Sequence, residues 1–166
     1  MKKTFFVIFA ILIASLLIKN SHSQEQSSGK KSQPKAVLQK SLEKLLKQKQ
    51  GYVIFTSQSN DSIFIQFTFS YDGNLLLDIP LYSQNENLKE QTETFLNNRG
   101  FSYRVSRNNY DLKPFEYGLN QLKDGGVVVN AIFPKDSELV AKSADEIFKE
   151  IFGLSEGYPL NVEFGE

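Results

Sequence analysis

The amino-acid sequence predicts an α+β domain, a two-layer sandwich in which helices cover one face of an antiparallel sheet. Three observations support this fold class. Several short segments alternate apolar and polar residues, which is typical of strands that bury one face. Three longer segments repeat apolar residues every three or four positions, which is typical of helices. Tight-turn signals separate the strands, and the predicted order of elements is αβββαββα.

The first predicted helix covers residues 35–50. Pro34 suits its first turn, because proline lacks only an N–H that would be unpaired there, and Gly51 suits its end. Lysines and glutamines occupy one side of this segment. The other side carries apolar residues at helical spacing: Val37, Leu38, Leu42, Leu45 and Leu46.

Three strands are predicted next, at Tyr52–Thr56, Ile63–Phe69 and Leu75–Ile79. The middle strand alternates most clearly, with one face formed by Ile63, Ile65, Phe67 and Phe69. Asp72-Gly73 between the second and third strands predicts a tight hairpin, because glycine adopts positive φ without a steric penalty. The first two strands are predicted to pair through residues 57–62.

A capping box predicts where the second helix begins. Ser83 and Glu86 have the spacing at which each side chain satisfies a free backbone N–H of the other. This helix ends at Arg99-Gly100, and residues 101–105 read as a strand. Residues 108–125 fit both helical and strand spacing, so both alternatives remain open there.

The C-terminal part predicts a strand, a helix and a tail. Val127–Phe133 is predicted as a strand that follows the turn Asp124-Gly125-Gly126, and Ser137–Phe152 has a broad apolar helical face. Gly153 ends this helix. The tail over residues 155–164 is partly apolar and is expected to pack back over the domain.

Three stretches resemble the type III secretion chaperone fold, as found in the TY-Chap and YbjN-like families. They are the strand Ile63-Phe-Ile-Gln-Phe67, the helix end Phe95-Leu-Asn-Asn-Arg-Gly-Phe101, and the closing helix Glu146–Leu154 with Tyr158-Pro-Leu160. The resemblance spans about residues 35–164. It implies the same αβββαββα sandwich and a chaperone-like role, and it brings no set of catalytic residues with it.

The N-terminus is typical of a secretory signal peptide. Lys2 and Lys3 precede an apolar run of 14 residues, Phe5–Ile18, and small residues at Ser21 and Ser23 predict cleavage after Ser23. An uncleaved anchor is the alternative, although spanning a bilayer takes roughly 20 apolar residues. The prediction is therefore a signal peptide over residues 1–23, a flexible polar leader over 24–34, one domain over 35–166, and a periplasmic or extracellular location.

Composition argues against most catalytic chemistry. The chain has no Cys, and its one His, His22, borders the predicted signal peptide. Cys nucleophiles, His-assisted triads and Cys/His zinc sites are therefore excluded from the mature chain. Asp72 and Asp124 lie in glycine turns, which explains both without acid–base work. The sequence predicts a protein that is not an enzyme and has no metal or cofactor.

Charge is distributed unevenly along the chain. Residues 24–50 hold seven lysines and two glutamates, net +5, whereas residues 51–166 hold nine basic and 17 acidic side chains, net −8. A solvated helix face explains the basic segment. Alternatively, a basic surface with Lys40, Lys44 and Lys47 binds an acidic partner or anionic lipid. Nucleic acid is not expected as a partner, since most of the domain would repel phosphate.

Binding of a polypeptide is the predicted function. Phe64, Leu76 and Val128 fall on the strand faces opposite the main apolar set, where they would form a partner-binding patch on the open sheet face. That face or a sheet edge would hold a polypeptide partner or a second copy of the chain. Alternatively, residues 108–125 or the tail cover the patch. The other candidates are a peripheral protein on anionic lipid and a carrier with an apolar pocket between helices and sheet.

Overall fold

The structure is a computed structural model, and it describes residues 33–81, 86–106 and 126–165. The predicted signal peptide, most of the predicted leader, the capping residue Ser83 and the ambiguous residues 108–125 lie outside these ranges.

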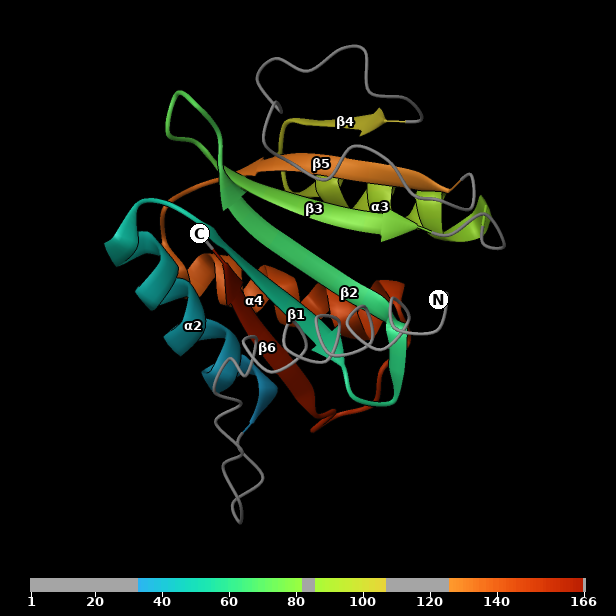
Figure 1. The fold of residues 1–166 in the computed structure, drawn as a ribbon. Coiled ribbons are helices and arrows are strands. Elements are labelled where there is room, and N and C mark those ends of the chain that lie inside the picture. Colours follow the sequence, from blue (N-terminus) through green and yellow to red (C-terminus); the bar gives the residue numbers. More distant parts are fainter. Residues whose placement is uncertain (1–32, 82–85, 107–125, 166) are drawn as a thin grey trace, which may run out of the picture. The chain divides into compact units, whose positions relative to one another are not determined.

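In the described ranges, six strands form one antiparallel sheet with the order β4-β5-β3-β2-β1-β6 (Figure 1). The strands are β1 (Tyr52–Ser57), β2 (Asn60–Phe69), β3 (Leu75–Leu81), β4 (Tyr103–Ser106), β5 (Val127–Phe133) and β6 (Leu160–Gly165). The helices are α2 (Pro34–Gln48), α3 (Glu86–Asn98) and α4 (Ser137–Glu146), and α4 continues into the π-helical turn η1 (Ile147–Ile151).

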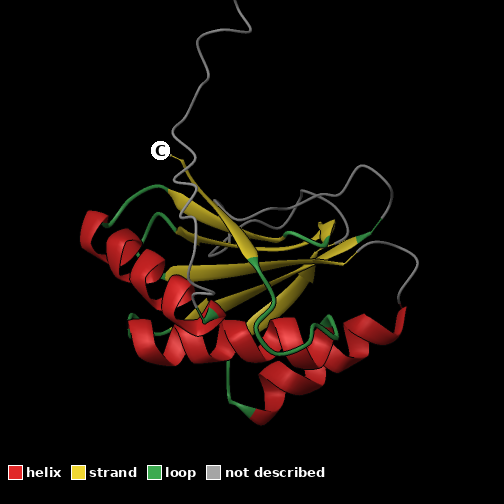
Figure 2. Ribbon diagram, turned by 90° about the horizontal axis from the view of Figure 1, so that it is seen from below, coloured by secondary structure: helices red, strands yellow, loops and turns green. Residues whose placement is uncertain are grey.

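The helices lie together on one face of the sheet, as Figure 2 shows. The predicted α+β fold class, a two-layer sandwich with an antiparallel sheet, is therefore confirmed. The face of the sheet opposite the helices is called the outer face below.

The hydrophobic core fills the space between the sheet and the helices. Phe67 lies near its centre and makes edge-to-face contacts with Phe55 at 6.2 Å and Phe133 at 6.0 Å between ring centroids. Phe133 also stacks on Phe101 at 4.1 Å. Alternate residues of the strands and one stripe of each helix point into this core, which accounts for the periodicity in the sequence.

Helix α2 buries the predicted face, with Leu38, Leu42 and Leu45 fully inaccessible to solvent. It ends at Gln48, and its C-cap residue is Lys49, two residues before the predicted Gly51. Lys49 adopts a left-handed conformation with φ 58°. The Lys49 N–H donates to the carbonyl of Leu45 at 3.0 Å, which caps the helix.

The β2–β3 hairpin forms as predicted. Gly73 has φ 77°, and its N–H donates to the carbonyl of Ser70 at 2.9 Å. The β1–β2 hairpin is tighter than predicted, because pairing extends to Ser57 and Asn60. Strand β2 is correspondingly longer than the predicted Ile63–Phe69.

The C-terminal elements differ from the prediction in two ways. The predicted helix over residues 137–152 is α-helical only to Glu146, and its last turn is the π-helical turn η1. The tail packs against the domain as expected, but it does so as a strand, because residues 160–165 form β6 and pair with β1. Leu160, Val162 and Phe164 alternate with polar residues and pack against the core, so this strand pattern was present in the sequence.

Candidate functional site

A row of polar side chains crosses the outer face of the sheet. Register places Gln66 of β2 opposite Asp78 of β3, Asp78 opposite Asn130 of β5, and Asn130 opposite Arg104 of β4. These four residues are called the central polar row. Asp78 and Asn130 are fully buried.

The side chains of the central polar row are joined by hydrogen bonds. The Asn130 amide donates to one carboxyl oxygen of Asp78 at 2.7 Å, and the Gln66 amide donates to the other at 3.3 Å. The carbonyl oxygen of Asn130 accepts from Arg104 Nε at 3.4 Å and from the Ser106 hydroxyl at 3.1 Å. Buried polar groups are costly unless they are paired, so these bonds explain how the row is tolerated. The sequence signal was one polar residue within each of two apolar strands.

The predicted binding residues Phe64, Leu76 and Val128 all belong to the outer face, but they do not form one exposed patch. Leu76 lies opposite Thr68 and Ile132, whereas Val128 lies opposite Pro80 and Ser106. The central polar row runs between these two groups.

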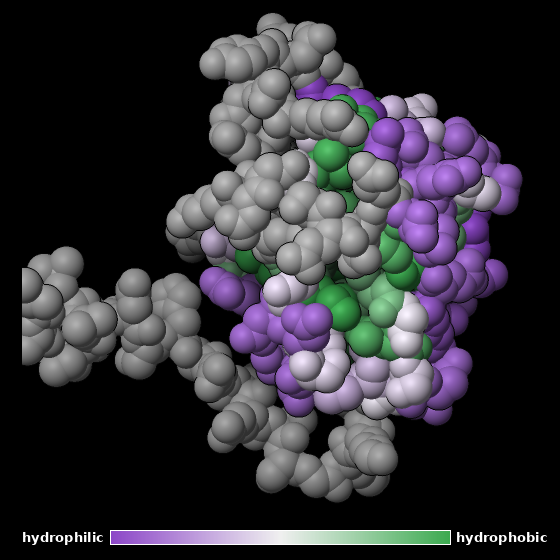
Figure 3. All heavy atoms as spheres, turned by 90° about the vertical axis from the view of Figure 1, so that its right-hand side faces the viewer, coloured by the Kyte–Doolittle hydropathy of each residue, from purple (hydrophilic) through white to green (hydrophobic). Residues whose placement is uncertain are grey.

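Leu76 and Val128 are fully buried, and Phe64 is partly buried. The expectation of an exposed apolar patch at these three residues is therefore wrong for Leu76 and Val128. Both lie on strands that have neighbours on either side and that are covered on both faces. Green hydrophobic side chains are visible on the side of the domain toward which β3 points, where hydrophilic residues border them (Figure 3).

The predicted basic residues Lys40, Lys44 and Lys47 lie on the exposed side of α2, one to two turns apart. They are called the lysine stripe. The Lys44 ammonium lies 3.9 Å from the centroid of the Phe164 ring of β6, a cation–π contact. Within the described ranges, none of these three lysines has an ion pair. Their positive charge is therefore available to a partner.

Strand β6 forms one edge of the sheet and runs beside α2 (Figure 1). It pairs with β1, and no strand of the described part pairs with its other side. Asn161 and Glu163 point to the outer face and are exposed. An edge strand of this kind presents unpaired backbone N–H and C=O groups.

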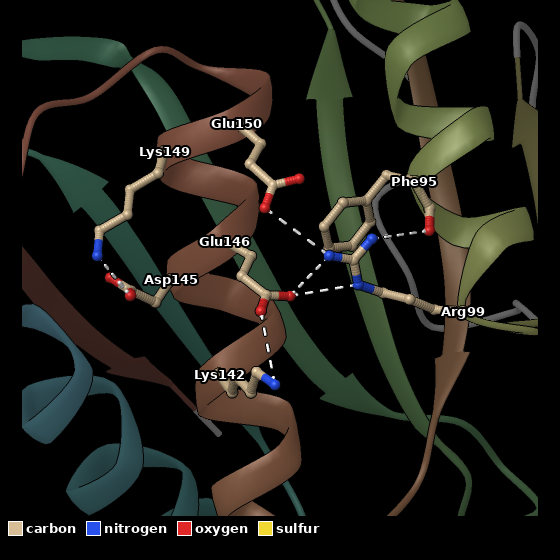
Figure 4. A network of polar contacts seen from close by, with 7 residues as sticks. All are labelled: Phe95, Arg99, Lys142, Asp145, Glu146, Lys149 and Glu150. Carbon is tan, nitrogen blue, oxygen red and sulfur yellow. Dashed lines mark hydrogen bonds and ion pairs between the residues drawn. The ribbon is translucent and has the colours of Figure 1, made fainter.

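Two acidic residues of α4, Asp145 and Glu146, make contacts with other elements. Figure 4 shows the Arg99 guanidinium between α3 and α4, where Nε and Nη2 donate to one carboxylate oxygen of Glu146 at 3.2 and 2.9 Å. The same guanidinium lies 3.6 Å from the centroid of the Phe95 ring. These contacts tie α3 to α4.

Asp145 has a separate set of partners. It accepts a hydrogen bond from the buried Tyr158 hydroxyl at 2.9 Å and forms an ion pair with Lys149 at 2.9 Å. Burial, together with the nearby negative charge of Asp145, raises the pKa of Tyr158 well above its ordinary range. Hydrogen bonds to Glu156 and Asp145 raise the pKa of Lys149. The carboxylates of Asp145 and Glu156 therefore hold Tyr158 and Lys149 in place.

No cluster of three His, Cys, Asp or Glu side chains that could hold a metal ion occurs in residues 33–81, 86–106 and 126–165. No helix in these ranges is long and apolar enough to span a membrane.

Comparison with known proteins adds no relative. No family model matches the chain, and neither a curated protein nor a solved structure matches it. The resemblance to chaperone-like families rests on the three sequence stretches alone.

Proposed function

We propose that this chain is an exported, non-enzymatic binding domain that holds an acidic polypeptide segment as an additional strand on β6. The observation that carries this proposal is the position of the lysine stripe beside an open sheet edge. Lys44 contacts Phe164 of that edge strand directly.

Strand addition uses the backbone of β6 for affinity. A partner strand would hydrogen-bond to the N–H and C=O groups on the side of β6 that β1 does not occupy. The exposed side chains Asn161 and Glu163 would flank it on the outer face. The central outer face is less suited to this task, because Leu76 and Val128 are buried.

The positive charge of the lysine stripe is expected to determine which polypeptides bind. A positive stripe without ion pairs attracts an acidic segment and speeds its association. A second copy of the chain fits less well, because pairing two β6 strands about a twofold axis would bring two lysine stripes toward one another. The proposed partner is therefore a different, acidic polypeptide.

The absence of a catalytic role is part of the proposal. Asp78 is buried within the central polar row, and Asp145 is held by Tyr158 and Lys149. Carboxylates used in this way support structure and do not face a substrate. The resemblance to chaperone-like families agrees with a protein that binds polypeptides.

Two peptides of matched length test the proposal: alternating Glu-Val repeats as the probe and alternating Lys-Val repeats as the control. The acidic peptide should protect backbone amides of β6 from hydrogen exchange and leave those of β3 unchanged. The basic peptide should bind at least about tenfold more weakly. Equal binding of both peptides, or protection confined to other strands, would contradict the proposal.

Variants with one reversed charge locate the binding surface. Lys44→Glu should weaken binding of the acidic peptide by about tenfold, since it replaces attraction with repulsion beside β6. Lys135→Glu is the matched control, because Lys135 is also exposed but lies in the turn between β5 and α4. An equal loss in both variants would show that net charge, and not the stripe, controls binding.

Anionic lipid is the second candidate, since the lysine stripe alone favours it. Vesicles of phosphatidylglycerol would then bind the chain in a salt-sensitive way that Lys40→Glu, Lys44→Glu and Lys47→Glu abolish together. Vesicles of phosphatidylcholine are the control. Lipid binding would leave the edge amides of β6 unprotected from exchange, which distinguishes it from strand addition.

A further inference from the structure

A surface hollow of about 350 Å³ lies between the α2–β1 turn and the β2–β3 turn. Two short stretches line it, residues 49–52 and residues 68–71. Its volume falls at the lower end of the range for small-molecule sites.

Tyr71 forms one wall and is 86% exposed, more than any other large apolar side chain in the described ranges. Its turn is held firmly. The Ser70 N–H donates to the Asn74 carbonyl at 2.9 Å, and the Asn74 N–H donates to the Ser70 hydroxyl at 2.9 Å. The turn therefore presents the Tyr71 ring to solvent from a backbone that is held by hydrogen bonds.

Tyr52 forms a second wall, and its position is fixed by the chain end of β6. A Cβ atom on Gly165 would lie 2.1 Å from the Tyr52 ring, so the ring packs directly on the Gly165 backbone. The hollow thus has two aromatic walls: Tyr52, whose ring is packed against Gly165, and Tyr71, whose ring is exposed to solvent.

Lys49 contributes the charge. It is the only non-glycine residue with positive φ in the part of the chain that the structure describes. Glycine is the favoured residue in this conformation at a helix end. Lys49 has no ion pair in the described ranges. The described residues that line the hollow include no Asp or Glu, although the Asp72 carboxylate accepts a hydrogen bond from the lining residue Ser70. A glycine at this position would adopt the same conformation with less strain than Lys49 does.

We infer that this hollow binds an acidic sugar, a pyranose ring that carries a carboxylate. The C–H face of the ring would stack on Tyr71, and the carboxylate would pair with the Lys49 ammonium. Gln50 also lines the hollow, and its side-chain amide would form hydrogen bonds to ring hydroxyls. A pyranose ring has polar groups around its edge and C–H groups on its face. The amide of Gln50 and the ammonium of Lys49 suit the edge, and the ring of Tyr71 suits the face. The hollow adjoins the end of β6 through Tyr52, but the inferred ligand contacts Lys49 and Tyr71, and the inference does not depend on the proposed function.

Glucuronic acid is the probe, and glucose is its neutral counterpart. Amide NMR spectra of the full chain should show saturable shifts at Gln50, Tyr52 and Tyr71 with glucuronic acid, with Kd in the millimolar range. Glucose should bind about tenfold more weakly, because it lacks the carboxylate. Absence of saturable shifts, equal affinity for the two sugars, or shifts centred elsewhere would overturn the inference.

Three variants complete the test. Tyr71→Ala should weaken glucuronic acid binding about tenfold. Lys49→Gly should remove the preference for glucuronic acid over glucose, and Lys35→Ala, an exposed lysine outside the hollow, should keep it. If Lys49→Gly still prefers glucuronic acid over glucose, the inferred pairing of the sugar carboxylate with Lys49 is wrong. Lys49→Gly should leave peptide binding at β6 unchanged, so failure of one proposal is distinguishable from failure of the other.

Discussion

The two faces of β3 are both buried, yet they are built differently. Toward the helices, Leu75, Leu77 and Ile79 contribute to an apolar core. On the outer face, Leu76 and Pro80 flank Asp78, whose carboxyl group is hydrogen-bonded across two neighbouring strands. An apolar face is stabilised by removal of area from water, whereas a buried face with a carboxyl group also depends on complete pairing. The outer face should therefore tolerate loss of a polar partner poorly.

The largest expected effect compares neighbouring leucines that point to opposite faces. Leu76→Ala and Leu77→Ala should each lower the free energy of unfolding by about 2–5 kcal/mol, because both side chains are fully buried. Urea unfolding followed by circular dichroism measures both. A loss below about 0.5 kcal/mol for Leu76→Ala alone would show that the outer face is open to solvent.

Loss of the Asp78 carboxylate, the hydrogen-bond acceptor in the central polar row, should have the next largest effect on the free energy of unfolding. Asp78→Ala should lower the free energy of unfolding by about 3 kcal/mol, because it leaves the buried amide of Asn130 without its 2.7 Å acceptor. Asp78→Asn keeps the size and an acceptor oxygen, so it should cost less and serves as the control.

A double-mutant cycle with Asn130→Ala isolates the contribution of the pair. The two substitutions together should cost clearly less than the sum of the single losses. Strict additivity would mean that the two side chains are independently stabilised, and the outer face would then not depend on pairing.

The fold could be predicted further from the sequence than the site could. Alternation in β2 and helical spacing in α2 and α4 identified the layers, because both report which side of an element is buried against the helix–sheet core. Strand β6 was missed even though Leu160, Val162 and Phe164 alternate, since the tail is short and follows Pro159.

The site was harder to predict because it depends on register between strands that are distant in the sequence. Asp78 and Asn130 are 52 positions apart, and nothing in either segment states that they face one another. Alternation also assigns Leu76 to the face opposite the core, but it does not say whether that face is solvent-exposed. The lysine stripe was visible in advance, because helical spacing is local.

Loss of the hydrogen bond between Tyr158 and Asp145, in the helix layer, should destabilise the fold less than loss of Asp78 from the central polar row. Tyr158→Phe should lower the free energy of unfolding by about 1–2 kcal/mol, since it removes the hydrogen bond to Asp145 while Lys149 still neutralises that carboxylate.

The contribution of Tyr158 should also depend on pH in a defined direction. Because the pKa of the folded-state hydroxyl is raised above its ordinary value of 10.0, this stability is present below that pH and is lost as the pH rises further toward the folded-state pKa. Thermal unfolding of the wild type and Tyr158→Phe between neutral and alkaline pH measures it. A difference that grows above pH 10 would contradict the sign.

The smallest expected effect is for substitutions on β6, and it tests whether the outer face is exposed at this edge of the sheet. Glu163 and Asn161 lie on the same face as Asp78 but on the edge strand, and both are exposed. Glu163→Ala should change the free energy of unfolding by less than about 0.5 kcal/mol, because no buried partner loses a contact. Asn161→Ala, measured in the same urea titration, is the matched control. A loss above about 1 kcal/mol at Glu163 would mean that the edge is covered like β3, and β6 would then not be free to accept a partner strand.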